Sequence, residues 1–80
     1  MKIPRDLSAQ QLIKALKKLG YVQTRQVGSH IRLTYESEGK SNHITIPNHN
    51  PIKVGTLNNI LNDLSLQLRI PKDQLIEKLK

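Results

Sequence analysis

Three histidines supply the side chains of this chain that are best suited to acid–base chemistry near neutral pH. His30 follows the pair Gly28–Ser29, His43 begins the short run HITIP, and His49 lies in the segment IPNHNP. The chain has no cysteine, which removes thiolate zinc ligands and cysteine nucleophiles. It also has no HExxH pattern. We therefore predict no metal site and no cofactor.

His30 is the candidate catalytic residue. It opens the alternating run HIRLTYE, in which the apolar residues should face a core while His30, Arg32 and Thr34 face the opposite side. An imidazole and a guanidinium would then share one open face. The alternative is an exposed strand histidine without a role, and the residues around it do not decide between these two interpretations.

The segment after the last expected strand should approach His30 at the same end of the sheet. If the runs that contain His30 and His43 pair as an antiparallel hairpin, Pro47 returns beside His30. His49 would then lie near the Gly–Ser turn, whereas His43 would lie at the far end, near Tyr35, and receives no role. The candidate RNA- or phosphate-binding residues at the His30 end are Ser29, Arg32, His49, Lys53 and Thr56.

Lys53 and Thr56 stand where a second helix should begin. The free N–H groups and positive dipole end of a helix N-terminus suit a phosphate. Lys53 would add a full charge, and Gly55 would allow close approach of a ligand to the backbone. The alternative is a plain helix start with Thr56 or a neighbour as its cap.

These residue types are able to cleave RNA without a metal. A histidine base would take the proton of a ribose 2′-hydroxyl, and the alkoxide would attack the adjacent phosphate. Lys and Arg would stabilise the charge that builds on the phosphoryl oxygens, and a second histidine would protonate the leaving oxygen. DNA lacks the 2′-hydroxyl and would resist this route. Two other classes stay open: a non-catalytic module that binds double-stranded RNA, and a protein-interaction domain whose basic surface meets an acidic partner.

The charge of the chain favours a polyanionic partner. Its 80 residues include 13 Lys and Arg against 6 Asp and Glu, for a net charge of +7, and the sequence pI is about 10.1. Only two residues are aromatic, both tyrosines, so stacking of bases on aromatic rings has little material. No apolar run is long enough for a membrane span, and no signal-peptide core is visible. We expect one cytoplasmic domain over residues 1–80, with no membrane partner.

Hydrophobic periodicity predicts the order helix, three strands, helix and short helix. Ser8 and Gln11 should form a capping box, and the first helix should end before Gly20. Strands are expected over residues 21–27, 30–36 and 43–47, with turns at 28–29 and 37–42. A helix should follow over residues 56–68, and a short one should start with Pro71 at its first position and hold Lys78 and Lys80 in its last turn. The expected fold is α+β in two layers, with helices on one face of the sheet and the other face open.

Three motifs, in this order and spacing, resemble the HicA toxins, also called the YcfA-like family, of type II toxin–antitoxin pairs. They are GSHIRL, ITIPNHN and IKVGTLNNIL, preceded by a matching segment LIKALKKLGYVQTRQVGSH. The resemblance covers about residues 8–66. The chain departs from the family at Tyr21, where Trp or Phe is common, and in the tail from Ile70 to Lys80, which would either pack on a partner or close the core.

The resemblance implies a fold like that of the double-stranded-RNA-binding domain, with the order α-β-β-β-α. It also implies an mRNA endoribonuclease whose catalytic histidine, in the Gly-Ser-His motif, is His30. His49 falls on the family's recurrent Pro-x-His position, for which we expect proximity to the substrate. The partner that the resemblance implies is a HicB-like antitoxin protein, which would cover this surface.

Overall fold

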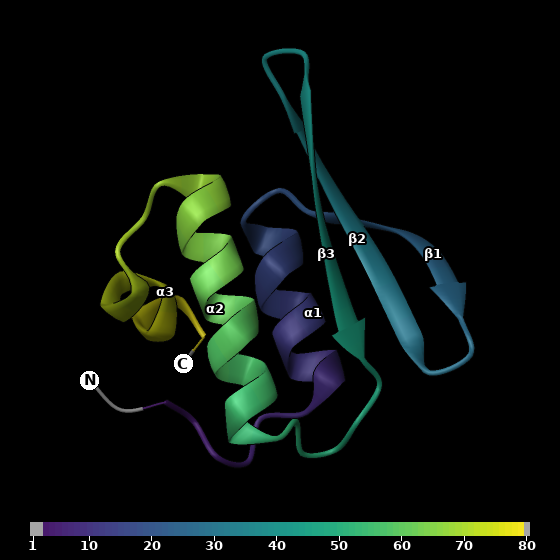
Figure 1. Ribbon diagram of the computed structural model, residues 1–80, viewed down its shortest axis with the longest axis vertical. Coiled ribbons are helices and arrows are strands. Elements are labelled where there is room, and N and C mark those ends of the chain that lie inside the picture. The colour runs from purple at the N-terminus through teal and green to yellow at the C-terminus, as the bar shows by residue number, and fades with distance from the viewer. Residues whose placement is uncertain (1–2, 80) are drawn as a thin grey trace.

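The computed structural model describes residues 3–79, and its elements follow the predicted order (Figure 1). A three-stranded antiparallel sheet and two long helices form two layers, and a short helix follows, so the α+β prediction is confirmed. The elements are α1 (Ala9–Lys18), β1 (Val22–Val27), β2 (His30–Ser37), β3 (Lys40–Pro47), α2 (Val54–Leu68) and α3 (Lys72–Lys78).

Helix α1 begins and ends as its sequence predicts. The Ser8 hydroxyl oxygen accepts a hydrogen bond from the Gln11 backbone N–H at 3.1 Å, and the Gln11 side chain accepts one from the Ser8 N–H at 2.8 Å. Gly20 follows the helix with a φ of 110°, and a Cβ at this position would lie 3.1 Å from the ring of Tyr35. Glycine therefore serves both the left-handed backbone and the close packing of the ring.

The sheet has the order β1-β2-β3. The first turn lies at Gly28–Ser29 as predicted, but the second is only two residues long, Glu38–Gly39, instead of the predicted 37–42. Glu38 and Gly39 both have a positive φ, 52° and 78°. This is the backbone of a tight hairpin turn, which lets the strands pair up to the turn itself. Residues 37–42 are all polar or glycine, so their sequence did not predict that some of them pair as strands.

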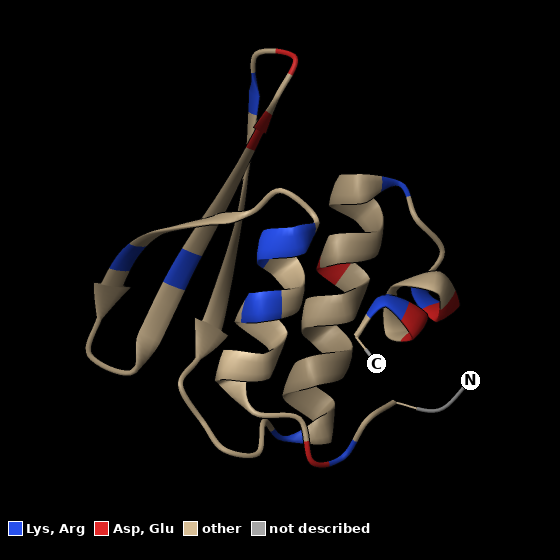
Figure 2. Cartoon of the chain, turned by 180° about the vertical axis from the view of Figure 1, so that it is seen from behind, with Lys and Arg blue, Asp and Glu red and all other residues tan. Residues whose placement is uncertain are grey.

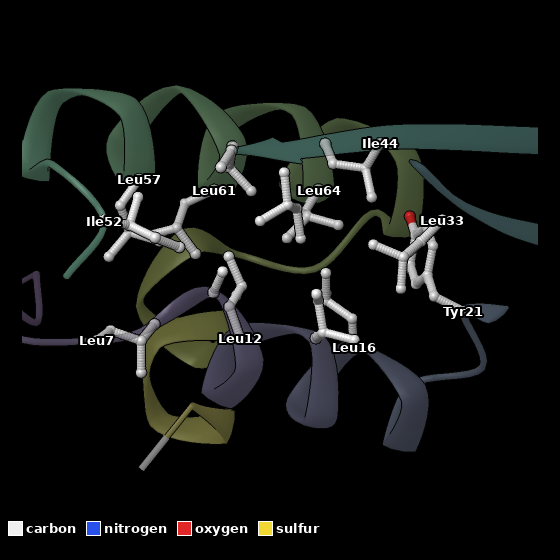
Figure 3. Close-up of a cluster of buried hydrophobic side chains, with 14 of the residues drawn as sticks. Leu7, Leu12, Leu16, Tyr21, Leu33, Ile44, Ile52, Leu57, Leu61 and Leu64 are labelled. Atoms are coloured by element: carbon white, nitrogen blue, oxygen red, sulfur yellow. The ribbon is translucent and has the colours of Figure 1, made fainter. Parts of the chain in front are cut away.

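The helices cover one face of the sheet and leave the other open (Figure 1). Side chains from the inner face of β2 and β3 meet those of the helices in a core that Figure 3 shows in close-up. Leu33 and Ile46 are fully buried, as are Leu12 and Leu16 of α1. Strand β1, in contrast, is exposed along its whole length. The open face is thus formed by the outward side chains of all three strands.

The C-terminal elements differ from the prediction at their starts. Helix α2 begins at Val54, two residues before the expected start, and Lys53 is its N-cap without a side-chain hydrogen bond. Pro71 is the N-cap of α3 and not its first helical residue. The Lys80 prediction lies outside the described residues. Leu75 and Ile76 of α3 are buried in the core, so the tail contributes to core closure.

Candidate active site

His30 is the first residue of β2 and lies on the open face of the sheet. It pairs with Val27 of β1 and with Pro47 of β3, as the hairpin argument predicted. The Asn48 N–H donates a hydrogen bond to the Ser29 carbonyl at 2.6 Å. The loop after β3 and the Gly–Ser turn are therefore joined at this end of the sheet. The His30 side chain is exposed, and it forms no hydrogen bond with any other described residue.

A shallow pocket surrounds the His30 imidazole. It has a volume of about 160 Å³ and is lined by Arg25, Val27, His30, Arg32 and Thr45. These residues come from all three strands, so the pocket is formed on the sheet face itself. A polymer can lie across such a site, whereas a small molecule would remain largely solvated in it.

A β-bulge brings Arg25 into this pocket. The register of β1 and β2 shifts between Gln23 and Arg25, so that Thr24 has no partner residue in β2. In a bulge of this kind two successive side chains lie on the same face. Regular alternation from Gln23, which lines a hollow against α1, would have turned Arg25 toward the helices. The bulge instead places it opposite Arg32.

The two arginines carry like charges at directly opposite positions of neighbouring strands. Such a pair destabilises a sheet unless an anion lies nearby. No salt bridge or hydrogen bond from the guanidinium of Arg25 or Arg32 to another described residue is found, and Figure 2 shows no acidic segment beside the basic ones of β1 and β2. The pocket therefore combines an exposed imidazole with two unneutralised guanidinium groups, which suits a phosphate beside a proton-transfer site.

The family model described as the HicA toxin of bacterial toxin–antitoxin matches residues 9–66 of the chain. The chain belongs to the HicA toxin family. The match includes all three strands and every residue that lines the His30 pocket. No curated protein and no solved structure matched the chain.

Four of the five candidate binding residues of this HicA-family chain do not line the pocket. His49 is exposed in the loop after β3, and its carbonyl accepts a hydrogen bond from the Ala9 N–H at 3.1 Å. Lys53 is exposed at the N-cap of α2, and Thr56 is half-buried in the first turn of that helix without capping it. Ser29 occupies the turn beside His30. Of the predicted site, the structure brings His30 and Arg32 together in the pocket, with Ser29 adjacent.

Arg25 is the charged residue of the pocket that was not predicted from the sequence as part of the site. The run VQTRQV alternates without a visible break, and no glycine marks the bulge. A bulge at Thr24, in a run without glycine or proline, has no residue signature of its own. The signal that could have identified Arg25 is its place opposite Arg32 when the strands are counted outward from the Gly28–Ser29 turn.

Thr34 also departs from the expectation for an outward strand residue. It lies on the open face, but it is only 9% exposed. Its hydroxyl oxygen lies 3.0 Å from that of Thr24 and 3.0 Å from Nδ1 of His43. The neighbouring polar side chains cover it, which alternation along a single strand does not reveal.

Two further hollows of the surface are lined without a histidine. One, of about 560 Å³, lies between the β2–β3 hairpin and the end of α2, and one of about 400 Å³ lies between α1 and β1. Within residues 3–79 no group of three His, Cys, Asp or Glu could hold a metal. The same residues include no helix long and apolar enough to cross a membrane.

Proposed function

We propose that this chain is a metal-independent mRNA endoribonuclease, the toxin of a toxin–antitoxin pair, that acts in the cytoplasm with His30 as its general base. The observation that carries the proposal is the pocket in which His30 lies beside the pair Arg25 and Arg32 on the open face of a HicA-family chain. Exposure of the imidazole leaves it accessible to a ribose, and the guanidinium groups supply charge for the phosphate beside it.

In the proposed reaction, His30 takes the proton of a ribose 2′-hydroxyl, and the oxygen attacks the adjacent phosphorus. Arg25 and Arg32 bind the non-bridging oxygens, whose negative charge increases in the transition state. The P–O5′ bond then breaks, and the leaving oxygen takes a proton from a second group, for which His49 in the neighbouring loop is our candidate. The products are a 2′,3′-cyclic phosphate and a 5′-hydroxyl end.

Lys53 and Thr56, at the start of α2, are proposed to bind the RNA backbone outside the pocket, and Ser29 to contact the substrate at the turn. The first N–H groups of α2 have no side-chain cap, and Lys53 adds a positive charge to this end of the helix. The partner of the toxin is proposed to be a HicB-like antitoxin protein that covers the pocket and so blocks access of mRNA.

The test is incubation of the purified protein with a long single-stranded mRNA in EDTA, beside the His30→Ala and Lys78→Ala variants. We expect the wild type and Lys78→Ala, which is changed on α3 away from the pocket, to fragment the RNA, and His30→Ala to bind without cutting. The same RNA with 2′-O-methyl groups should stay intact. Because His30 is exposed, the variant should retain the wild-type circular dichroism spectrum.

The main alternative is a non-catalytic module that binds double-stranded RNA through the same basic surface. It would be supported if the wild type and His30→Ala bound RNA equally and neither cut it. The absence of RNA binding, even at low salt, would leave the third class, a domain that binds an acidic protein.

A further inference from the structure

A chain of hydrogen bonds on the open face ends at His43, to which the sequence analysis gave no role. The Thr24 hydroxyl lies 3.4 Å from the carbonyl oxygen of Arg32 and 3.0 Å from the Thr34 hydroxyl. The Thr34 hydroxyl in turn lies 3.0 Å from Nδ1 of His43. The bulge that brings Arg25 into the His30 pocket also places Thr24 at the start of this chain.

The direction of each bond follows from the number of hydrogens. The Arg32 carbonyl has none to give, so the Thr24 hydroxyl donates to it. The single hydrogen of Thr34 is then needed for Thr24, and Nδ1 of His43 must donate to Thr34. In the neutral ring this leaves Nε2 without a hydrogen, as an acceptor. Any other assignment loses one of the three bonds.

The backbone of His43 is fixed as well as its ring. Nε2 of Gln67, in α2, donates to the His43 carbonyl at 2.8 Å, and the Gln67 side-chain oxygen accepts from the Tyr21 hydroxyl at 2.5 Å. The side chain of His43 is nevertheless exposed. One nitrogen of the ring is therefore held against Thr34, and the other has no hydrogen-bond partner among the described residues. The exposed side chain lies on the same side of the sheet as the His30 pocket.

The position of His43 excludes a role at the phosphodiester that His30 would act on. His43 pairs with Thr34, which is four residues along β2 from His30, a distance of about 13 Å. A general acid must reach the leaving oxygen within hydrogen-bond distance. His43 is therefore placed to contact a different nucleotide of a strand that runs across the sheet.

The charges on this part of the face indicate what His43 would contact. Arg25 and Arg32 lie on its His30 side, and Glu36 lies two residues beyond Thr34 on the same face. A phosphate would be repelled by the Glu36 carboxylate, and an acceptor nitrogen has no hydrogen to give it. A neutral hydrogen-bond donor fits instead, and the sugar of RNA carries one in its 2′-hydroxyl.

We propose that Nε2 of His43 accepts a hydrogen bond from the 2′-hydroxyl of a nucleotide bound beyond Arg32, and that Thr34 is the positioning residue that holds the ring for it. This contact would make the protein distinguish RNA from DNA by binding as well as by chemistry. It rests on the proposed function only in that the ligand is a single strand of RNA across this face.

The first measurement concerns the free protein and needs no RNA. Nitrogen-15 NMR of the imidazoles should show His43 with its hydrogen on Nδ1 when the ring is neutral. Thr34→Val, which keeps the shape but removes the hydroxyl, should abolish this preference, and Thr34→Ser should restore it. A neutral ring in the wild type with its hydrogen on Nε2 would overturn the proposal.

The second measurement is the affinity of a short RNA in the His30→Ala background, where the RNA stays uncut. We expect His43→Ala to weaken binding roughly 2- to 10-fold, the effect of one hydrogen bond. One 2′-deoxy substitution in the oligonucleotide should weaken binding by the same factor, and this effect should vanish in His43→Ala. Thr34→Val should act like His43→Ala, and Thr34→Ser like the parent.

The outcomes separate this proposal from the proposed ribonuclease activity. If the wild type never cuts RNA but a 2′-deoxy position affects binding only when His43 is present, the nuclease proposal fails and the contact stands. If the wild type cuts RNA while His43→Ala has the parent affinity and the parent response to every 2′-deoxy position, the contact is overturned and the nuclease stands. A protein that binds no RNA overturns both.

Discussion

The pair Arg25 and Arg32 shows how a residue that lowers the stability of the fold can serve a site. Their positions are directly opposite on neighbouring strands, where two cations repel each other. The structure supplies no acidic partner for either guanidinium among the residues it describes. A bound phosphate would remove the repulsion, so the free protein carries a cost that its ligand would offset.

We therefore predict that Arg25→Gln stabilises the free protein and weakens its binding to RNA. Glutamine keeps much of the side chain and removes the charge, so the change isolates the repulsion. Relief of one like-charge pair should raise the free energy of unfolding by about 0.2–1 kcal/mol. For a domain of this size, this corresponds to a rise in Tm of about 1–8 °C. Thermal unfolding by circular dichroism measures it.

The matched control for this prediction is Lys78→Gln, which removes the same charge from α3. Its Tm should not rise, because Lys78 stands in the last turn of α3, where a positive charge is favourable. A fall in Tm for Arg25→Gln would show that the guanidinium makes stabilising contacts that outweigh the repulsion. In the double variant with Arg32→Gln, the second substitution should add no further relief, because the pair is already broken.

At the scale of elements, the parts predictable from sequence were those with a local cause. The capping box of α1, Gly20 after it and the Gly28–Ser29 turn each follow from a few adjacent residues. The bulge in β1 and the burial of Thr34 depend on side chains from other strands. Arg25 was therefore not predicted as a pocket residue, because its position depends on the bulge.

Helix α2 begins two residues earlier than predicted. Its N-cap, Lys53, forms no side-chain hydrogen bond, so no capping residue marks this start in the sequence.

Tyr21 connects the elements that support the open face, and it leads to a prediction on pH. It is 1% exposed, and burial, with a smaller effect of Tyr35, raises the pKa of its hydroxyl from 10.0 to about 12. The fold therefore favours the neutral phenol over the phenolate. This preference stabilises the folded state fully below pH 10, and the stabilisation is lost as the pH rises toward 12. The total loss in the free energy of unfolding is about 2–3 kcal/mol.

Urea denaturation at several values between about pH 9 and pH 11, on the wild type and Tyr21→Phe, tests this prediction. Tyr21→Phe should be less stable at the lower pH, because Gln67 loses its partner, but its stability should decline less as the pH rises. All other titratable groups are the same in both proteins, so the difference between them isolates Tyr21. Parallel declines would contradict the raised pKa.

At the scale of the whole molecule, the basic residues form two groups on different layers. The basic residues of β1 and β2 belong to the His30 pocket, whereas those of α1 lie on the helix layer (Figure 2). Both sets contribute to a net charge of +7 that attracts RNA from a distance. Only groups that touch phosphates release counterions on binding. The salt dependence of binding therefore separates residues of the interface from residues of the general field.

We predict that the double variant Arg25→Gln/Arg32→Gln, in the His30→Ala background, loses about 1.4 from the slope of log K against log salt for single-stranded RNA, at about 0.7 for each lost phosphate contact. Lys17→Gln/Lys18→Gln has the same net charge but changes the end of α1, and its slope should stay near that of the parent. Affinities at several salt concentrations give both slopes. Equal slopes for the two double variants would mean that RNA does not lie across the open face, because position on the molecule would then have no effect beyond charge.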